Sequence, residues 1–142
     1  LLRNILIEMG VPKKGTAFED PEIDSIYETY NSPRSKYFIV EQNNIIKGGA
    51  GISQLKNEAF DICELQKMYF DISIRGKGIG SKMIDKCLEF ARANKFTLCY
   101  IETMPNMLDA QRLYLKYGFE YINSPMGNTG HSACPIWMTK SL

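Results

Sequence analysis

The sequence of 142 residues has only one histidine and one tryptophan, and it has no surplus of charge of either sign. Its 17 Lys and Arg residues stand against 16 Asp and Glu residues, so the formal net charge is +1. A charge this small creates no field to hold a nucleic acid or an anionic membrane, so neither is expected as a partner. No apolar run approaches the ~18 residues that span a bilayer, and no signal-peptide pattern opens the chain. These absences predict a cytoplasmic location.

The 4 cysteines include no C-x-x-C pair. With His131 as the single histidine, so scattered a set is not expected to form an ordinary cysteine and histidine zinc site. Three of the cysteines fall in apolar periodic segments, where free cysteine packs as a small hydrophobe. We therefore expect reduced thiols and no metal.

With 44% hydrophobic and 23% charged residues, the chain is expected to form one domain, residues 1–142, around one core. Apolar spacing predicts helices over residues 1–10, over 18–30 with Pro21 in the first turn, from 79 to 91, and from Pro105–Asn106 to a stop at Gly118. Extended segments are predicted at residues 36–42, 45–55, 60–70, 97–103, 119–124 and 134–142. Strands that precede and alternate with helices indicate the α/β class, α+β by some schemes, with one sheet.

The segment from Arg75 to Gly80 lies between a predicted strand and a predicted helix. Unpaired backbone N–H groups and the helix dipole form an anion site there, and glycines let a phosphate approach the backbone closely. A bound pyrophosphate is one interpretation, and a glycine-rich turn that merely changes direction is the other. The spacing matches neither a Walker loop nor a dinucleotide fingerprint, because the segment reads G-x-G-x-G.

Two motifs resemble those of the GNAT superfamily of acyl-CoA-dependent N-acetyltransferases. The pattern [QR]-x-x-G-x-[GA] is matched by Arg75, Gly78 and Gly80. The pattern A-x-x-L-Y-x-x-x-G-F is matched by Ala110, Leu113, Tyr114, Gly118 and Phe119. More narrowly, the segments CELQKMYF, CYIETM, MGNTGH and CPIW are similar to a bacterial subgroup that also occurs fused to MarR-type regulators, although no DNA-binding part is visible in this sequence.

The resemblance implies a mixed, mostly antiparallel central sheet flanked by helices. The family's fourth and fifth strands, here residues 60–70 and 97–103, would splay apart. Relatives usually begin with a strand before the first helix, so the usual first strand is expected to be missing from this chain.

The resemblance also implies that acetyl-CoA is the acetyl donor. The loop and the start of the following helix would hold its diphosphate through Arg75, Gly76, Lys77, Gly78, Ile79, Gly80 and Ser81. The backbone of Met68, Tyr69 and Phe70 would pair with the pantetheine arm, since the unpaired edge of a splayed strand satisfies amides. Core packing is the alternative role for Met68 and Tyr69. Asn106 is a cofactor contact by resemblance and a helix N-cap by its own sequence context.

Acetyl transfer needs a base to take a proton from the amine and a donor for the departing thiolate. Glu64 stands where many relatives have their base, and it either points into a cleft with a raised pKa or lies on a solvent face. Tyr114 matches the proton-donating tyrosine of the family, with core packing as the alternative. Both are candidate catalytic residues.

Three further residues are candidates for acceptor binding. Glu102 and Thr103 end the family's fifth strand near the expected cleft. His131 lies in a polar loop, residues 127–134, that would border the substrate or would be an ordinary turn-rich loop. The acidic residues Glu19, Asp20 and Glu22 attract cationic substrates or simply lie on a solvated helix.

The sequence thus predicts an N-acetyltransferase that acts by direct attack in a ternary complex. A small-molecule amine is the expected acceptor, and a homodimer is possible because relatives often dimerise. The alternatives are an acyl-CoA-binding sensor without turnover and an acetyltransferase for a protein lysine or N-terminus.

Overall fold

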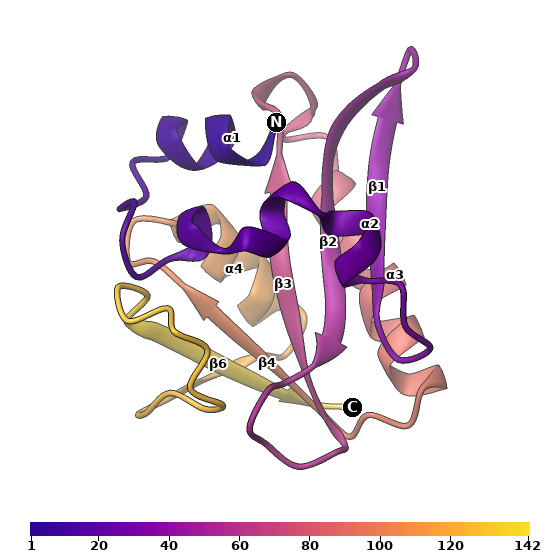
Figure 1. Cartoon of the computed structure of the whole chain (residues 1–142), viewed down its shortest axis with the longest axis vertical. Helices are drawn as coiled ribbons and strands as arrows, with labels where there is room; N and C mark the ends of the chain where they lie inside the picture. Colours follow the sequence, from indigo (N-terminus) through magenta and orange to yellow (C-terminus); the bar gives the residue numbers. More distant parts are fainter.

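Six strands form one sheet, in the order β1-β2-β3-β4-β6-β5, in the computed structural model, which describes residues 1–142 (Figure 1). The strands are β1 (Lys36–Gln42), β2 (Ile45–Gln54), β3 (Ile62–Phe70), β4 (Leu98–Thr103), β5 (Glu120–Ile122) and β6 (Ile136–Ser141). All neighbours pair antiparallel except β3 and β4, which are parallel. The predicted mixed, mostly antiparallel sheet is confirmed.

The parallel pair separates soon after it begins. The pairing of β3 with β4 covers only Ile62–Glu64 against Leu98–Tyr100, and the two strands then diverge (Figure 1). Beyond Glu64, the edge of β3 that faces β4 has no partner strand. Backbone N–H and C=O groups on such an edge are available to an extended ligand.

Helices cover both faces of the sheet (Figure 1). The helices α3 (Ile79–Ala93) and α4 (Leu108–Lys116) lie behind it, and α1 (Leu2–Glu8) and α2 (Ile26–Thr29) lie in front. The main core fills the space between the sheet and the rear helices, because α3 turns Met83, Ile84, Cys87, Leu88 and Ala91 inward. A smaller cluster of Leu6, Val11 and Ile23 lies under the front segments. None of the helices combines the length and apolarity needed to cross a membrane.

The single helix predicted over residues 18–30 is wrong. The segment forms the short 3₁₀ helices η1 (Ala17–Glu19) and η2 (Pro21–Asp24), followed by α2. A residue before proline is pushed out of the helical region, and Asp20 accordingly has φ −61° and ψ 119°. Ser25 then interrupts the chain again with φ −137° and ψ 48°. The carboxylate of Asp20 is thereby turned toward the sheet instead of lying on a solvated helix.

The predicted N-cap at Asn106 is also wrong. Helix α4 begins at Leu108 with Met107 in the cap position, and no side chain caps it. The Asn106 amide instead donates to the backbone oxygen of Met9 over 3.1 Å, which links α4 to the end of α1.

The glycines of β2 allow a close approach of aromatic rings. A Cβ atom on Gly51 would lie 2.5 Å from Cζ of Tyr30. The buried Tyr30 ring therefore rests directly on the backbone of β2 and reaches the front face of β3.

Candidate active site

A bulge in β3 gives the site its shape. Opposite Ala50 the pairing shifts, so that Gly51 faces Gln66 while Gly49 faces Tyr69. Two residues of β3, Lys67 and Met68, therefore stand against one residue of β2, and Lys67 takes a left-handed φ of 50°. Side chains of a regular strand alternate between faces, but the extra residue puts Gln66 and Lys67 on the same face. Both consequently line the same hollow on the front of the sheet.

Glu64 lies on this face, two residues before Gln66, and is 5% exposed. Its Oε2 accepts a hydrogen bond of 2.9 Å from Nε2 of Gln66, whose Oε1 accepts one of 2.6 Å from the Tyr30 hydroxyl. Burial raises the pKa of Glu64 to about 7, although the hydrogen bond from Gln66 and the charges of His131 and Lys67 oppose the shift. A carboxyl with such a pKa exchanges protons near neutral pH.

The hollow has two parts, which share a wall of Glu64, Gln66, Lys67 and His131. The inner pocket, of about 40 Å³, is lined additionally by Val11, Thr16, Ala17, Leu65, Tyr69, Glu102, Thr103, Met104, Met107 and Cys134. The outer pocket, of about 310 Å³, is lined additionally by Asp20, Pro21, Glu22, Thr29, Ser53, Gln54, Lys56 and Thr129. The structure thus brings together four candidates from the sequence, namely Glu64, Glu102, Thr103 and His131.

A chain of charged groups crosses the hollow. Asp20 contacts two cations, with Oδ2 3.1 Å from Nζ of Lys67 and Oδ1 3.0 Å from Nε2 of His131. The other ring nitrogen of His131 lies 3.5 Å from Oε2 of Glu102. Burial alone would lower the pKa of His131, but the hydrogen bonds and charges of Asp20 and Glu102 raise it to about 9. The imidazole is therefore cationic at neutral pH.

The polar loop of residues 127–134 is held over the hollow from several sides. Glu102 accepts hydrogen bonds from the Thr129 hydroxyl, at 2.7 Å from Oε1 and 2.9 Å from Oε2. Asn57 donates to the backbone oxygen of Gly127 over 3.1 Å, and Ala133 donates to that of Gly15 over 2.9 Å. These bonds fix the position of His131.

One trio of residues near the hollow has metal-ligating atoms close together. The atoms of Glu102, His131 and Cys134 all lie within 4.8 Å of one another. Glu102 and His131 are already engaged by Thr129, Asp20 and each other. These interactions account for both side chains without a metal ion.

A second cavity, the glycine-loop groove, lies where β3 meets α3. It has a volume of about 410 Å³ and is lined by Met9, Met68, Tyr69, Phe70, Ile74, Arg75, Gly76, Gly78, Ile79, Gly80, Ser81, Asp109, Ala110 and Leu113. Most of the residues predicted to bind the acetyl donor are therefore on one surface. Lys77 and Asn106 are not part of this lining, and the Lys77 ammonium instead donates to the backbone oxygen of Ser73 over 2.8 Å.

The groove has the features that a diphosphate requires. Gly76 and Gly78 have φ of 72° and 74°, and a Cβ atom on either would meet no heavy atom within 4 Å. Gly78 also caps the N-terminus of α3, whose first N–H groups have no acceptor within the helix. Arg75 is fixed by bonds to the backbone oxygen of Phe70 and to Glu8, while its buried Nη2 has no partner within the chain. The residues present therefore fit the diphosphate of a coenzyme A ester.

Tyr69 connects the two cavities, because it lines both the inner pocket and the groove. Burial raises the pKa of Tyr69, and Tyr114 acts in the same direction, so the two phenols occupy one buried region. Burial also raises the pKa of Tyr114, whose ring packs 5.9 Å from that of Phe119. Tyr114 lines neither cavity.

Several residues of the hollow were missed or undervalued at the level of the sequence. Asp20 was one member of an acidic segment, while Gln66 and Lys67 fall in an ordinary strand pattern. The bulge that aims Lys67 into the hollow has no recognisable signal, since lysine is not a residue that favours positive φ. The Asp20-Pro21 dipeptide was the one available sign, because it predicts a break in the helix at Asp20.

Comparison with known proteins places the chain in a family. Residues 3–119 match the acetyltransferase (GNAT) family, and the chain belongs to it. The protein is therefore an N-acetyltransferase.

Individual relatives agree with this assignment. The chain is 40% identical to the uncharacterized N-acetyltransferase YjgM of Escherichia coli (strain K12) over 143 positions, which cover 100% of this chain and 86% of that protein. A GNAT-family acetyltransferase from Staphylococcus aureus Mu50 has the same fold, with a TM-score of 0.85 at 20% identity over 99% of this chain and 88% of that one. A GNAT acetyltransferase from Elizabethkingia anophelis, solved with acetyl-CoA bound, has a TM-score of 0.63 at 20% identity over 87% of this chain and 84% of that one.

Proposed function

We propose that the protein acetylates a primary amine of a small polar molecule by direct attack in a ternary complex. The acetyl donor lies in the glycine-loop groove, and the acceptor enters through the outer pocket. The observation that carries the proposal is the position of Glu64, a buried carboxyl on the wall shared by the inner and outer pockets, with a pKa of about 7.

The donor is bound largely by the backbone. Acetyl-CoA supplies the thioester acyl group, and the N-terminus of α3 with Gly76 and Gly78 receives its diphosphate. Arg75 offers the unpaired Nη2 to the same anion. The edge of β3 that faces β4, from Met68 to Phe70, receives the amides of the pantetheine arm, because β4 has diverged from it.

Glu64 acts as the general base. An amine attacks only as the free base, so the acceptor ammonium must lose a proton, and Glu64 accepts it directly or through water. Gln66 holds the carboxylate in place from the side, and Tyr30 in turn holds Gln66. The amine nitrogen then bonds to the acetyl carbon as the carbon–sulfur bond breaks, and the second proton that the nitrogen loses balances the proton taken up by the sulfur.

Tyr114 acts as the proton donor for the sulfur that leaves. Tyr114 shares a buried region with Tyr69, the residue common to the groove and the inner pocket. Because its pKa is raised, the phenol stays protonated at neutral pH and can donate a hydrogen bond to the sulfur as negative charge develops there.

The dimensions of the hollow favour a small acceptor over a protein lysine or N-terminus. The outer pocket of about 310 Å³ is walled by Asp20 to Glu22 on one side and by Thr129 and His131 on the other. A peptide acceptor would need an open groove across this region.

A turnover screen tests the proposal. Acetyl-CoA is incubated with amino acids, polyamines, aminoglycosides and short peptides, and release of the free thiol is followed. A saturable small acceptor is expected. Acetyl-CoA binding without turnover in any series would instead support a sensor, and turnover restricted to peptides would support a protein acetyltransferase.

A further inference from the structure

Lys67 is an unusual cation for its surroundings. Its side chain is 6% exposed, and Asp20 is its only charged partner within 4 Å. The bulge keeps it on the same face as Glu64, at the cost of a left-handed backbone that is uncommon for a residue with a side chain. An ammonium group has three N–H donors, so one ion pair leaves donors available to a ligand in the pockets that Lys67 lines.

Asp20 is shared rather than dedicated to Lys67. Its carboxylate lies between the Lys67 ammonium and the His131 imidazole, which is cationic at neutral pH. Two largely buried cations therefore face the outer pocket with Asp20 between them, while Glu102 contacts His131 alone, from the inner pocket. His131 thus has two carboxylates and Lys67 has only a shared one, so Lys67 is the cation whose remaining N–H donors are open to a second anion.

The charge of the outer pocket changes during the proposed reaction. Its cations are Lys56, Lys67 and His131, and its carboxylates are Asp20, Glu22 and Glu64. These balance while Glu64 is ionised. When Glu64 has taken the proton of the amine, the outer lining itself has one more positive than negative group, and Glu102 faces only the His131 side of it, from the inner pocket. An acceptor that carries one anionic group restores the balance at that moment.

We propose that the acceptor is a zwitterion, an amine whose carboxylate binds to Lys67 on the His131 side of the outer pocket while its nitrogen faces Glu64. This inference rests on the proposed function, and it names the chemical class of the acceptor. No hydrophobic side chain lines the outer pocket, so the remainder of the acceptor is small or polar. Polycationic acceptors are disfavoured, because Asp20 and Glu22 are already paired with Lys67, His131 and Lys56.

The test compares each L-amino acid with its own α-carboxamide, which differs by the loss of one negative charge. Thiol release from acetyl-CoA is measured with the wild-type protein, and kcat/KM is determined for both members of each pair. At least one acid is expected to exceed its carboxamide by about tenfold or more, which is the effect of one well-placed charge-assisted contact. The amine of a carboxamide is less basic and supplies more free base, so this difference acts against the expected result.

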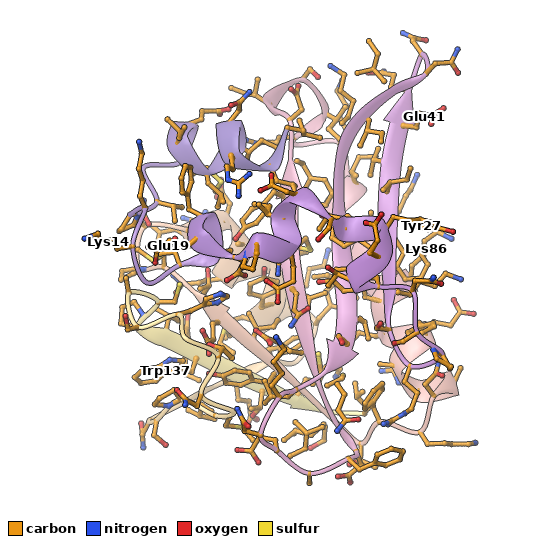
Figure 2. The ribbon with its side chains drawn as sticks, viewed as in Figure 1. Lys14, Glu19, Tyr27, Glu41, Lys86 and Trp137 are labelled. Atoms are coloured by element: carbon orange, nitrogen blue, oxygen red, sulfur yellow. The ribbon has the colours of Figure 1, made fainter.

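Variants of Lys67 locate the anion. In Lys67→Met, the kcat/KM for the acid divided by that for its carboxamide is expected to fall close to one, while the KM for acetyl-CoA stays unchanged. Lys67→Arg keeps the positive charge and is expected to retain much of this ratio. Lys86→Met serves as the matched control, because Lys86 is exposed on the outer side of α3 (Figure 2). Thermal unfolding confirms that each variant is folded.

The outcomes separate the two proposals. If carboxamides are acetylated as well as the acids by the wild-type protein, the inference is overturned and the proposed function stands. The inference is also overturned if Lys67→Met is folded and still acetylates the acids in preference to their carboxamides as strongly as the wild-type protein does. If no amine of either series is acetylated, the inference is overturned, and turnover of the polyamines and aminoglycosides in the wider screen decides whether the proposed function stands.

Discussion

The Tyr30 hydroxyl lies 2.6 Å from Oε1 of Gln66, and the same amide donates from Nε2 to Oε2 of Glu64 over 2.9 Å. A hydroxyl that donates to the amide oxygen decides which end of the amide faces the carboxylate. Tyr30 comes from the front segment, and the absence of a side chain on Gly51 leaves space for its ring. A residue distant in the sequence thereby fixes the hydrogen bond to the proposed base.

Tyr30→Phe is expected to raise the apparent pKa on the acidic limb of kcat/KM. Without the hydroxyl, Gln66 is free to turn its amide, and Glu64 loses the hydrogen bond that lowers its pKa. A shift of up to about one unit is expected, because a hydrogen bond to a charged group contributes roughly 1.5 kcal/mol. The control is Tyr27→Phe, since Tyr27 is 79% exposed at the periphery (Figure 2). If the acidic limb of the kcat/KM profile is not shifted in Tyr30→Phe, the Tyr30 side chain contributes only packing to the site.

Glu64→Gln is expected to lower kcat by ~10²-fold or more at neutral pH, since positioned general bases contribute 10² to 10⁴. The wild-type rate should rise through the Glu64 pKa of about 7 and then level off. The variant should keep gaining rate above that pH, because alkaline solution supplies the free amine without the protein. Glu41→Gln, at the exposed tip of β1, is the matched control (Figure 2). Full activity of Glu64→Gln at every pH would assign the base elsewhere.

The carboxyl of Glu64 should lower the free energy of unfolding as the pH rises. The pKa of Glu64 is raised from 4.5 to about 7 in the folded chain, so folding favours its protonated form. No penalty exists below about pH 4.5, and the full penalty, of the order of 3 kcal/mol, is reached above about pH 7. Urea unfolding of Glu64→Gln should therefore show greater stability than wild type at pH 8 and little difference at pH 4. An equal difference at both values would refute this linkage.

Gly78→Val is expected to weaken acetyl-CoA binding by about tenfold or more, a change of 1.4 kcal/mol in binding free energy. The new side chain meets no protein atom, so it intrudes on the space of the diphosphate. Gly10→Val is the matched control, because Gly10 has a similar φ of 67° and equally open space, and it lines neither cavity. Both variants carry the same backbone strain, so calorimetric titration separates strain from lost binding. If Gly78→Val and Gly10→Val bind acetyl-CoA with equal affinity, the loop around Gly78 does not contact the acetyl donor.

Tyr114→Phe should bind acetyl-CoA nearly normally and turn over slowly. The substitution keeps the ring that packs on Phe119 and removes only the hydroxyl. A loss of ~10²-fold in kcat is the expected scale for a missing proton donor. Calorimetry measures the binding and thiol release measures the rate. Normal turnover would return Tyr114 to a purely packing role.

The fold was largely predictable because its signals are local. Alternating and β-branched runs mark all six strands, and the apolar stripe from Met83 to Ala91 marks α3. The failures have equally local causes. Asp20 before Pro21 broke a helix that the apolar spacing had suggested, and Asn106 bonded to Met9 in place of capping α4.

The site was predictable only where a motif or a strand end marked it. Glu64, Glu102 and Thr103 could be placed near one cleft from their strand positions, and they do line the inner pocket. Lys67 and Asp20 could not, because their pairing needs a bulge in β3 and a contact between segments 47 residues apart in the sequence. Tertiary contacts of this kind leave no periodic trace in either segment.

The four cysteines determine how cleanly the reaction can be observed. All are buried, and burial is among the causes that raise the pKa of Cys87, Cys99 and Cys134 above its usual range. Thiols that are shielded and protonated react slowly with disulfide reagents. A chromogenic reagent of that kind, added to the native protein, should therefore report the coenzyme A produced with almost no background from the protein itself. Unfolded molecules would expose their thiols and give an immediate burst, so the same cuvette also measures the fraction of folded enzyme.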